Sequence, residues 1–434
     1  MTEFSWLVLL GGLTFFFFGL TYARRGLQSL AGDRMRLAIA HLTGNRFAAL
    51  GTGALITVVL QSSTATILML MSLASTGLLS LTQAFGVILG ADIGTTLVVI
   101  LISIKKISDY ALLLVILGFF LEWVFKNSKG IYYTGRVLFG FGLIFYGMKL
   151  MTATAAPLAG DPNYQILFGV FEKNPVGLLV VSTFLTVIIQ TSAATIGMAI
   201  ALALAGALTL EQAIPIVLGA NVGTCFTSIL AGLTGDVNGK RVALAHLLVK
   251  VTGVALTIPF VAPIAEILAR LAGLLTGWIP LIQPSVAGQI AVVHLFFNAA
   301  LAVLFLPFLP AGVLLVSKLV PERKKKEAFG PKYLDAKALE TPALAFAQAK
   351  QELLRIANMV RDLYRDSLKI FTPGEMAEQS LAEIEARDDK IDLLEKEVRF
   401  YLAKISRESV TEQQLAQEMA LLGVGDDLEG IGDI

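Results

Sequence analysis

The sequence is poor in charged residues, cysteine and histidine, and it lacks an ATP-binding motif. Only 15% of its 434 residues are charged while 56% are hydrophobic, which excludes a water-soluble fold for most of the chain and indicates a bilayer protein. Cys225 is the only cysteine, so neither an internal disulfide nor a CxxC metal or redox motif can form. No G-x-x-x-x-G-K-S/T sequence occurs, so energy for transport must come from an ion gradient. We therefore expect neither an enzyme nor a nucleic-acid-binding protein.

The three histidines do not suggest a metal site. His246 and His294 occur in similar apolar strings, whereas His41 lies in a basic loop. No cysteine or carboxylate accompanies the first two at ligand spacing, so we expect them to form hydrogen bonds between membrane helices.

The charges that are present divide the chain in two. Residues 1–321 hold 17 Lys+Arg and 10 Asp+Glu, a balance of +7, while residues 322–434 hold 17 and 23, a balance of −6. The boundary coincides with a basic run, Arg323 to Lys326, which we expect on the cytoplasmic side. The sequence thus predicts a transmembrane domain over 1–321 and a cytoplasmic, soluble helical bundle over 322–434.

Several stretches are long and apolar enough to cross a bilayer, for which a helix needs roughly 20 residues. They are Phe4–Tyr22, Ala84–Ile104, Tyr110–Phe125, Ile131–Met151, Ala213–Leu233, Val242–Ala262 and Gln289–Val316. Two further apolar stretches, Ala48–Leu79 and Leu178–Leu208, are interrupted by polar clusters.

The transmembrane domain contains an internal repeat. A shift of 129 residues carries Gln61 to Gln190, and it aligns many other polar and small residues. Among these pairs are Asn45 and Asn174, Thr57 and Thr186, Ser63 and Ser192, Thr66 and Thr195, Gln83 and Gln212, Gly90 and Gly219, Gly94 and Gly223, and Thr95 and Thr224. We predict repeat one over about 1–126, repeat two over about 130–262, and an extra helix over about 289–316.

The second repeat is expected to be inverted relative to the first, because each contains an odd number of membrane crossings. Positive charge supports this arrangement, since four basic segments would then face one side. These segments are 24–46, 126–136, 240–241 and 318–326, and Lys105 and Lys106 are exceptions. We predict a multi-pass protein of the cell inner (plasma) membrane, with the N-terminus outside and the C-terminal domain in the cytoplasm.

The interrupted stretches carry the main functional signal. They read Gln61-Ser62-Ser63-Thr64 in repeat one and Gln190-Thr191-Ser192-Ala193 in repeat two. Backbone can leave a helix at membrane depth only inside protein or a watery cavity, so we predict two re-entrant helical hairpins. Each tip would aim a helix N-terminus and hydroxyl groups at an anion, while side-chain and backbone carbonyls suit sodium. Alternatively, such Ser and Thr residues bond back to their own helix or join helices, but two clusters in one register make this less probable.

A second repeated motif places Asp92 and Asn221 at equivalent positions. Asp92 is one of few carboxylates within an apolar span, and we expect it to neutralise a coupling sodium or accept a proton. The alternative is a partly solvated acid near a helix end. Lys250 is either an end residue that snorkels to the membrane surface, which we favour, or part of the anion path. The residues expected to bind or couple sodium are Gln61, Thr66, Asp92, Thr95, Gln190, Thr195, Asn221 and Thr224.

At these duplicated motifs the sequence resembles the type II sodium-phosphate cotransporter family. The resemblance covers about residues 1–320 and implies sodium-coupled symport of inorganic phosphate by alternating access. It implies phosphate binding by Gln61, Ser62, Ser63, Thr64, Gln190, Thr191, Ser192 and Ala193. The chain departs from the family pattern at Thr191, Asp92 and Lys250, which affects ion stoichiometry and charge movement.

The tail resembles a PhoU-like helical domain. Leu353, Ile356, Val360, Leu363 and Ile370 follow helical spacing, as do Ile391, Leu394, Val398, Leu402 and Ile405. Thr372-Pro373-Gly374 would separate two helices, and Ser409 with Glu412 would form a capping box. Glu385, Asp389, Glu429 and Asp433 resemble that domain's metal-binding motif, although solvated surface charge is the stronger interpretation. The chain ends within the helix expected to complete the domain, which suggests truncation.

Two other functions remain open at this level. One is a proton-coupled carrier or a carrier of another oxyanion, and the other is a phosphate-sensing membrane scaffold that signals through its tail. The expected partners are phosphate, sodium and the lipid bilayer, with a homodimer and a regulatory partner for the tail also considered.

Overall fold

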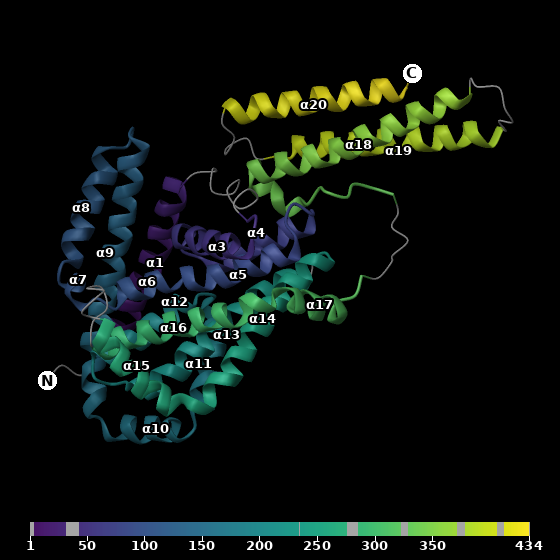
Figure 1. The fold of residues 1–434 in the computed structure, drawn as a ribbon. Coiled ribbons are helices and arrows are strands. Elements are labelled where there is room, and N and C mark those ends of the chain that lie inside the picture. Colours follow the sequence, from purple (N-terminus) through teal and green to yellow (C-terminus); the bar gives the residue numbers. More distant parts are fainter. Residues whose placement is uncertain are drawn as a thin grey trace. The chain divides into compact units, whose positions relative to one another are not determined.

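The computed structural model describes residues 4–31, 43–233, 235–275, 285–322, 329–370, 378–405 and 412–433. In these residues every regular element is a helix (Figure 1). Contacts divide the chain into two compact units. The larger is Met1–Met71 with Ser80–Val320, and the smaller is Ser72–Leu79 with Pro321–Ile434.

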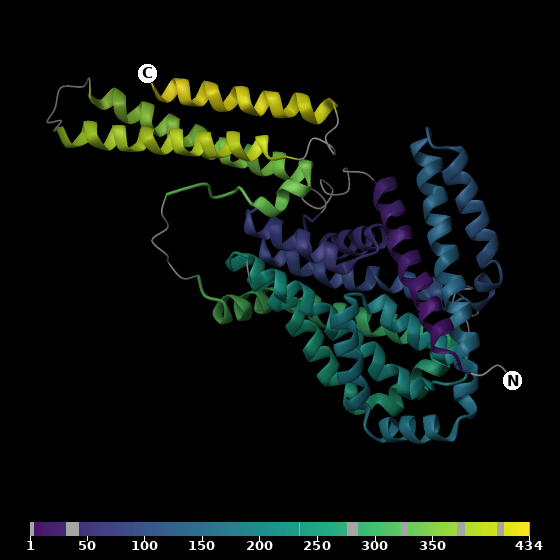
Figure 2. The same ribbon diagram turned by 180° about the vertical axis from the view of Figure 1, so that it is seen from behind.

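The larger unit is built from long apolar helices joined by short connections (Figures 1 and 2). Repeat one contains α1 (Trp6–Ala31), α3 (Arg46–Leu60), α4 (Ser63–Ser75), α5 (Leu81–Gly94), α6 (Thr96–Ile102), α7 (Lys105–Asp109) and α8 (Ala111–Val124). Repeat two contains α9 (Lys129–Ala155), α10 (Pro162–Lys173), α11 (Pro175–Ile189), α12 (Ser192–Leu204), α13 (Leu210–Leu233) and α14 (Val237–Thr257). Helices α15 (Val261–Leu275), α16 (Val286–Phe305) and α17 (Leu309–Leu319) follow.

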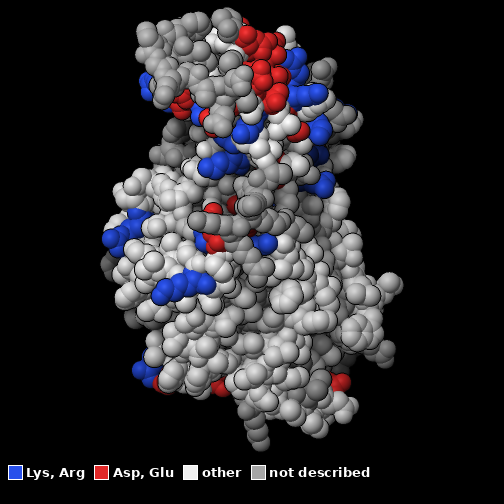
Figure 3. Space-filling view, turned by 90° about the vertical axis from the view of Figure 1, so that its right-hand side faces the viewer, with Lys and Arg blue, Asp and Glu red and all other residues white. Residues whose placement is uncertain are grey.

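Six described helices or helix runs are long and apolar enough to cross a membrane, and a bent pair formed by α10 and α11 would make a seventh. Exposed apolar side chains lie on these spans, such as Trp6 on α1, Leu230 on α13 and Val303 on α16. Figure 3 shows a face on which this unit is broadly uncharged, whereas acidic and basic residues cluster on the tail. The protein is therefore an all-α membrane protein with a helical tail.

The two repeats are related by an approximate two-fold axis that passes between α1 and α9. A Cβ on Gly12 would lie 2.8 Å from the Gly147 oxygen, and one on Gly19 would lie 2.6 Å from the Gly140 oxygen. A shift of 128 carries Gly12 to Gly140 and Gly19 to Gly147, so the two contacts exchange under the repeat symmetry. Since α1 and α9 pack antiparallel along this line, the axis lies across the helices, as an inverted repeat requires.

Glycines also fix the hairpin arms against the next helix in each repeat. In both halves, a Cβ on a glycine of α5 or α13 would collide with α3 or α11, so the backbones approach as closely as only glycine allows. The matched contacts are Gly90 with Leu50, Gly94 with Ala54, Gly219 with Leu179, and Gly223 with Thr183. Each pair reproduces the other after the same shift of 129.

Several helix boundaries differ from the predicted spans. Helix α14 begins five residues before Val242, because the side chain of Asp236 accepts the Gly239 amide and caps the helix ahead of its apolar stretch. The predicted span 84–104 is divided at Thr95 into α5 and α6. Helix α1 continues beyond Tyr22 to Ala31 and carries Arg24 to the first hairpin tip.

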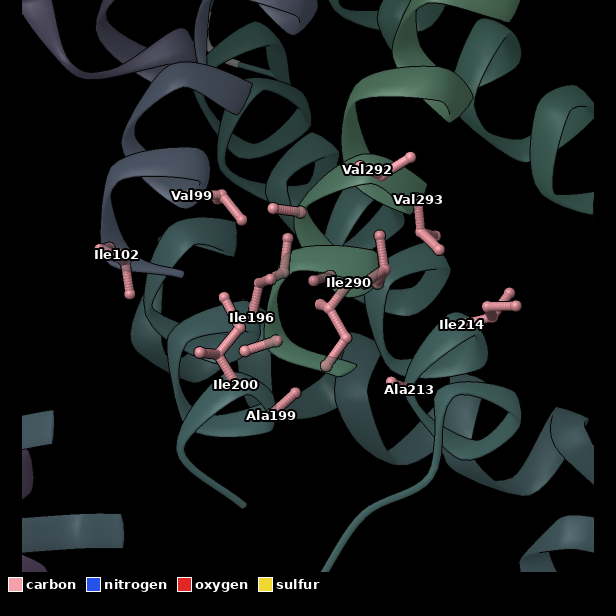
Figure 4. Close-up of a cluster of buried hydrophobic side chains, with 14 of the residues drawn as sticks. Val99, Ile102, Ile196, Ala199, Ile200, Ala213, Ile214, Ile290, Val292 and Val293 are labelled. Carbon is pink, nitrogen blue, oxygen red and sulfur yellow. The ribbon is translucent and has the colours of Figure 1, made fainter. Parts of the chain in front are cut away.

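A buried apolar cluster joins the repeats around the second hairpin arm. Side chains of α12, including Ile196 and Ile200, pack with Val99 of α6, Ile214 of α13 and Ile290 of α16 (Figure 4). This packing encloses the second arm in protein instead of leaving it in lipid.

The tail forms its own helical unit from α18 (Pro342–Ile370), α19 (Glu378–Ala403) and α20 (Glu412–Gly432). The burial predicted from helical spacing is confirmed for four residues of α18 and five of α19 or just after it, namely Leu353, Ile356, Val360, Leu363, Ile391, Leu394, Val398, Leu402 and Ile405. The side chain of Ile370, the segment 372–374 and Ser409 lie outside the described residues, as do His41 and the basic run 323–326.

Candidate substrate and ion sites

The first hairpin turns on a left-handed glutamine. Helix α3 ends at Leu60, and Gln61 adopts φ 51° and ψ 31°, after which α4 begins at Ser63. The Gln61 amide still bonds to the Thr57 oxygen, so the turn closes α3 and redirects the chain within two residues. Ser62 caps α4, because its Oγ accepts the Ala65 amide at 3.1 Å.

The second hairpin repeats this turn. Gln190 adopts φ 63° and ψ 22° after α11, and α12 begins at Ser192. Thr191 makes no side-chain capping bond to α12, so it leaves the first-turn amides of α12 uncapped. Ser63 and Ser192 are equally buried, each 8% exposed, while Ser62, Thr64, Thr191 and Ala193 are half-buried.

Every described residue with positive φ belongs to a repeat pair. Besides Gln61 and Gln190, these are Gly77 and Gly206, which are also 129 residues apart. Glycine adopts this conformation freely, whereas glutamine does not. Two strained glutamines at equivalent tips indicate that the side chain is kept for a reason other than backbone geometry.

Paired threonine hydroxyls lie directly behind each tip. Thr57 Oγ1 and Thr66 Oγ1 are 2.9 Å apart, and Thr186 Oγ1 and Thr195 Oγ1 are 2.7 Å apart. All four side chains are buried. Each pair ties the two arms of its hairpin together one turn from the break.

Helix α1 contacts both hairpins. Arg24 Nε donates to the Gln61 oxygen at 3.1 Å, and Gln28 Nε2 donates to the Leu60 oxygen at 3.4 Å. Eight residues earlier, the ring of Phe16 lies against Gly197 of α12, where a Cβ would approach it to 2.4 Å. The freed carbonyls of the first tip are thus occupied by α1, a feature that the sequence did not reveal.

A buried charged cluster lies where α5, α13, α14 and α16 meet. Asp92 Oδ2 is 2.9 Å from Lys250 Nζ, and Asp92 Oδ1 is 3.5 Å from His246 Nε2. Lys250 also donates to Asn221 Oδ1 at 2.9 Å and to Asn298 Oδ1. Lys250 is 1% exposed, so the favoured prediction that it snorkels to the surface is wrong. Burial is tolerated because the Asp92 carboxylate balances its charge and two amide oxygens accept its hydrogen bonds.

The histidines behave differently from each other. His246 contacts Ser228 Oγ at 3.3 Å and Cys225 Sγ at 3.7 Å, so the predicted bonding between helices is confirmed for this residue. Neither ring nitrogen of buried His294 has a hydrogen-bond partner in the part of the chain that is described. The shared spacing of His246 with Lys250 and of His294 with Asn298 was the sequence signal that could have marked this cluster.

The remaining predicted sodium residues bond to nearby backbone. Thr95 Oγ1 donates to the Asp92 oxygen at 2.7 Å, and Thr224 Oγ1 donates to the Asn221 oxygen at 2.8 Å. These bonds are again repeat equivalents, and their hydroxyl oxygens keep acceptor capacity.

In the tail, the acidic side chains that lie close together differ from the predicted metal-binding residues. Ligand oxygens of Asp388, Asp392 and Asp433 lie within 4.8 Å of one another. Burial, followed by the charges of Asp392 and Asp433, raises the pKa of Asp388. Of the predicted residues, Asp433 belongs to this group and raises the pKa of Glu429, whereas Glu385 and Asp389 are outside it. Three adjacent carboxylates suit a hard divalent cation.

Comparisons with known proteins match both units. A model of the family described as "Na+/Pi-cotransporter" matches the chain twice, over residues 15–153 and 146–282. A model described as "PhoU domain" matches residues 353–434.

Three relatives illustrate the range of similarity. The "Putative inorganic phosphate export protein YjbB" of Escherichia coli (strain K12) is 26% identical over 427 residues, covering 98% of this chain and 76% of that protein. The "Uncharacterized protein YqeW" of Bacillus subtilis (strain 168) is 31% identical over 313 residues, 72% of this chain and 97% of that protein. The "Sodium-dependent phosphate transport protein 2A" of Rattus norvegicus is 31% identical over 113 residues, 25% of this chain and 18% of that protein. No solved structure matches the chain.

Proposed function

Because the chain belongs to the Na+/Pi-cotransporter family, we propose that it is a sodium-coupled carrier that binds inorganic phosphate at its two hairpin tips. The main support for this proposal is the pair of glutamines in left-handed backbone conformation. Each is followed within two residues by a helix that begins at a buried serine. Such a carrier is a transporter and not an enzyme.

Phosphate would be held by helix N-termini and hydroxyl groups. The positive dipole end and the first-turn amides of α4 and α12 favour an oxyanion. The first turn of α12 supports this role, since Thr191 leaves its amides uncapped. We assign phosphate to Gln61, Ser62, Ser63, Thr64, Gln190, Thr191, Ser192 and Ala193.

Sodium would bind beside the tips. Buried threonine hydroxyls and the side-chain carbonyls of the two glutamines offer the oxygen ligands that a hard cation prefers. The hydroxyls belong to the pair Thr57 and Thr66 and the pair Thr186 and Thr195. Gln61 Nε2 donates to the Val58 oxygen, which leaves Oε1 as the acceptor end of that side chain. Sodium near the anion would offset its charge, so binding of each would favour binding of the other.

An inward sodium gradient would drive uptake of phosphate. In this proposal the C-terminal tail lies in the cytoplasm. Export is the second candidate, favoured by the name of the Escherichia coli relative that covers 98% of this chain. The direction of net phosphate flux depends on the gradients of phosphate and sodium and on which ion is coupled to phosphate.

The test is transport of radiolabelled phosphate in proteoliposomes that contain the full chain. We expect accumulation under an inward sodium gradient and at least a tenfold loss in a Ser63→Ala plus Ser192→Ala variant. Ser103→Ala is the matched control, because Ser103 is a buried serine that bonds to the Ile100 oxygen away from the tips.

Three outcomes would change the proposal. Wild-type flux in the double variant would overturn the site, and flux that ignores sodium but follows a proton gradient would overturn the coupling ion. Flux only out of phosphate-loaded vesicles under the same sodium gradient would favour export.

A further inference from the structure

The cation that balances Asp92 is part of the chain itself. Lys250 lies in the middle of α14 and its Nζ meets oxygens from three other helices. Asp92 belongs to α5, Asn221 to α13 and Asn298 to α16. Asn221 and Asn298 are themselves held in place, since their Nδ2 atoms donate to the Val217 and His294 oxygens.

This ammonium sits where equivalent positions of the two repeats converge. Asp92 and Asn221 are related by the shift of 129 residues, and both place an oxygen 2.9 Å from the same nitrogen. A point contacted by both members of a repeat pair lies near the axis that relates the repeats. The ammonium therefore lies near this axis, where the two repeats meet.

The ligand set suits a hard cation of single charge. One carboxylate and two amide carbonyls supply three oxygens with one negative charge, and an ammonium offers three donors to match them. A sodium ion would satisfy the same oxygens and the same charge. The difference is that sodium can leave on either side of the membrane, whereas Lys250 cannot.

Resting on the proposed sodium-coupled function, we propose that the Lys250 ammonium permanently fills a sodium site formed by Asp92, Asn221 and Asn298. One coupling ion is then replaced by a fixed charge, and the sodium that drives phosphate binds only beside the hairpin tips. Asp92 serves Lys250 and is neither a ligand of transported sodium nor a free proton acceptor.

The test counts sodium ions bound by the purified full chain, with radioactive sodium at equilibrium. We expect Lys250→Asn to bind one more sodium per chain than wild type, because the vacated oxygens receive an ion. Asp92→Asn combined with Lys250→Asn is the matched control and should return to the wild-type count, since the site then lacks its negative charge. Asp92→Asn alone should also keep the wild-type count.

If Lys250→Asn is too unstable for sodium counting, its thermal unfolding is measured instead. We expect this variant to be stabilised by sodium chloride over choline chloride by more than wild type is. An unchanged count in a folded Lys250→Asn protein would overturn the proposal. Loss of one sodium in Asp92→Asn, or failure of Lys250→Asn to fold at any sodium concentration while the double variant folds, would also overturn it. These counts do not depend on phosphate flux, so failure of the wild type to carry phosphate would refute only the proposed function.

Discussion

Gln61 and Gln190 hold a backbone conformation that costs an ordinary residue about 1 kcal/mol relative to glycine. The left-handed conformation is unfavourable for glutamine, and the turn also interrupts a helix within an apolar stretch. Substitutions at these two positions can therefore show whether the glutamine side chain contributes to stability or to transport.

We predict that Gln61→Gly keeps or slightly raises thermal stability but lowers phosphate transport at least tenfold. Glycine relieves the strain at φ 51°, while it removes the carboxamide at the tip. Unfolding of the purified protein and flux in proteoliposomes measure the two effects separately. Gly206→Gln is the converse control, since it places a glutamine at φ 75° away from the tips and should cost about 1 kcal/mol. Full activity of Gln61→Gly would mean that the side chain has no role in binding.

At this scale, the sequence predicted some residues and missed others for a clear reason. Gln61, Asp92 and their equivalents are rare polar residues repeated at one offset, so the pattern alone singled them out. Pairing of Asp92 with Lys250 could not be predicted, because periodicity along one helix says nothing about which distant helix lies opposite. Lys250 therefore looked like a residue near a membrane surface.

At the scale of elements, close packing of α3 on α5 and of α11 on α13 fixes each hairpin. We predict that Gly90→Ala destabilises the larger unit by about 3 kcal/mol, because the new Cβ would lie 1.9 Å from the Leu50 oxygen. Gly51→Ala on α3 has nothing within 4 Å and should be tolerated. Heating followed by size-exclusion chromatography of the detergent-solubilised protein compares the two. Equal melting of both variants would show that the helices can separate without cost.

Helices were easier to predict than their breaks. The interruptions at the two tips were visible because polar residues replace apolar ones. The interruption at Thr95 between α5 and α6 was not, since Thr95 keeps right-handed helical backbone angles and Leu81–Ile102 as a whole is long and apolar enough to be one span. Spacing likewise identified the buried faces of α18 and α19, but of the three acidic residues that meet it identified only Asp433 and not Asp388 or Asp392.

We predict that the tail becomes more stable as the pH falls from 7 through the raised pKa values of Asp388 and Asp392, and that a divalent cation has the same effect at pH 7. Burial and neighbouring charge raise the pKa values of Asp388 and Asp392 in the folded state, so their ionised forms oppose folding above those values. Hydrogen exchange of α19 and α20 in the full chain, with and without Mg²⁺, measures both effects. Asp388→Asn should remove most of each, whereas Asp427→Asn, an equal charge change on an exposed residue, should not. Exchange rates that ignore Mg²⁺ would identify the cluster as solvated surface charge.

At the scale of the whole molecule, the separation into two compact units allows a carrier to be tested against a sensing scaffold. All residues assigned to phosphate, and the cluster around Lys250, belong to the larger unit, which has its own buried core.

We predict that a chain ending at residue 321 still binds phosphate with an affinity within about threefold of the full chain, because none of its proposed ligands is lost. Equilibrium binding of labelled phosphate to both purified proteins tests this, with Ser63→Ala plus Ser192→Ala in each background as the specificity control. A changed transport rate with unchanged binding would assign the tail a regulatory role. Loss of binding in a shortened chain that remains folded would show instead that the tail completes the site, and the molecule would then be better described as a sensor than as a carrier.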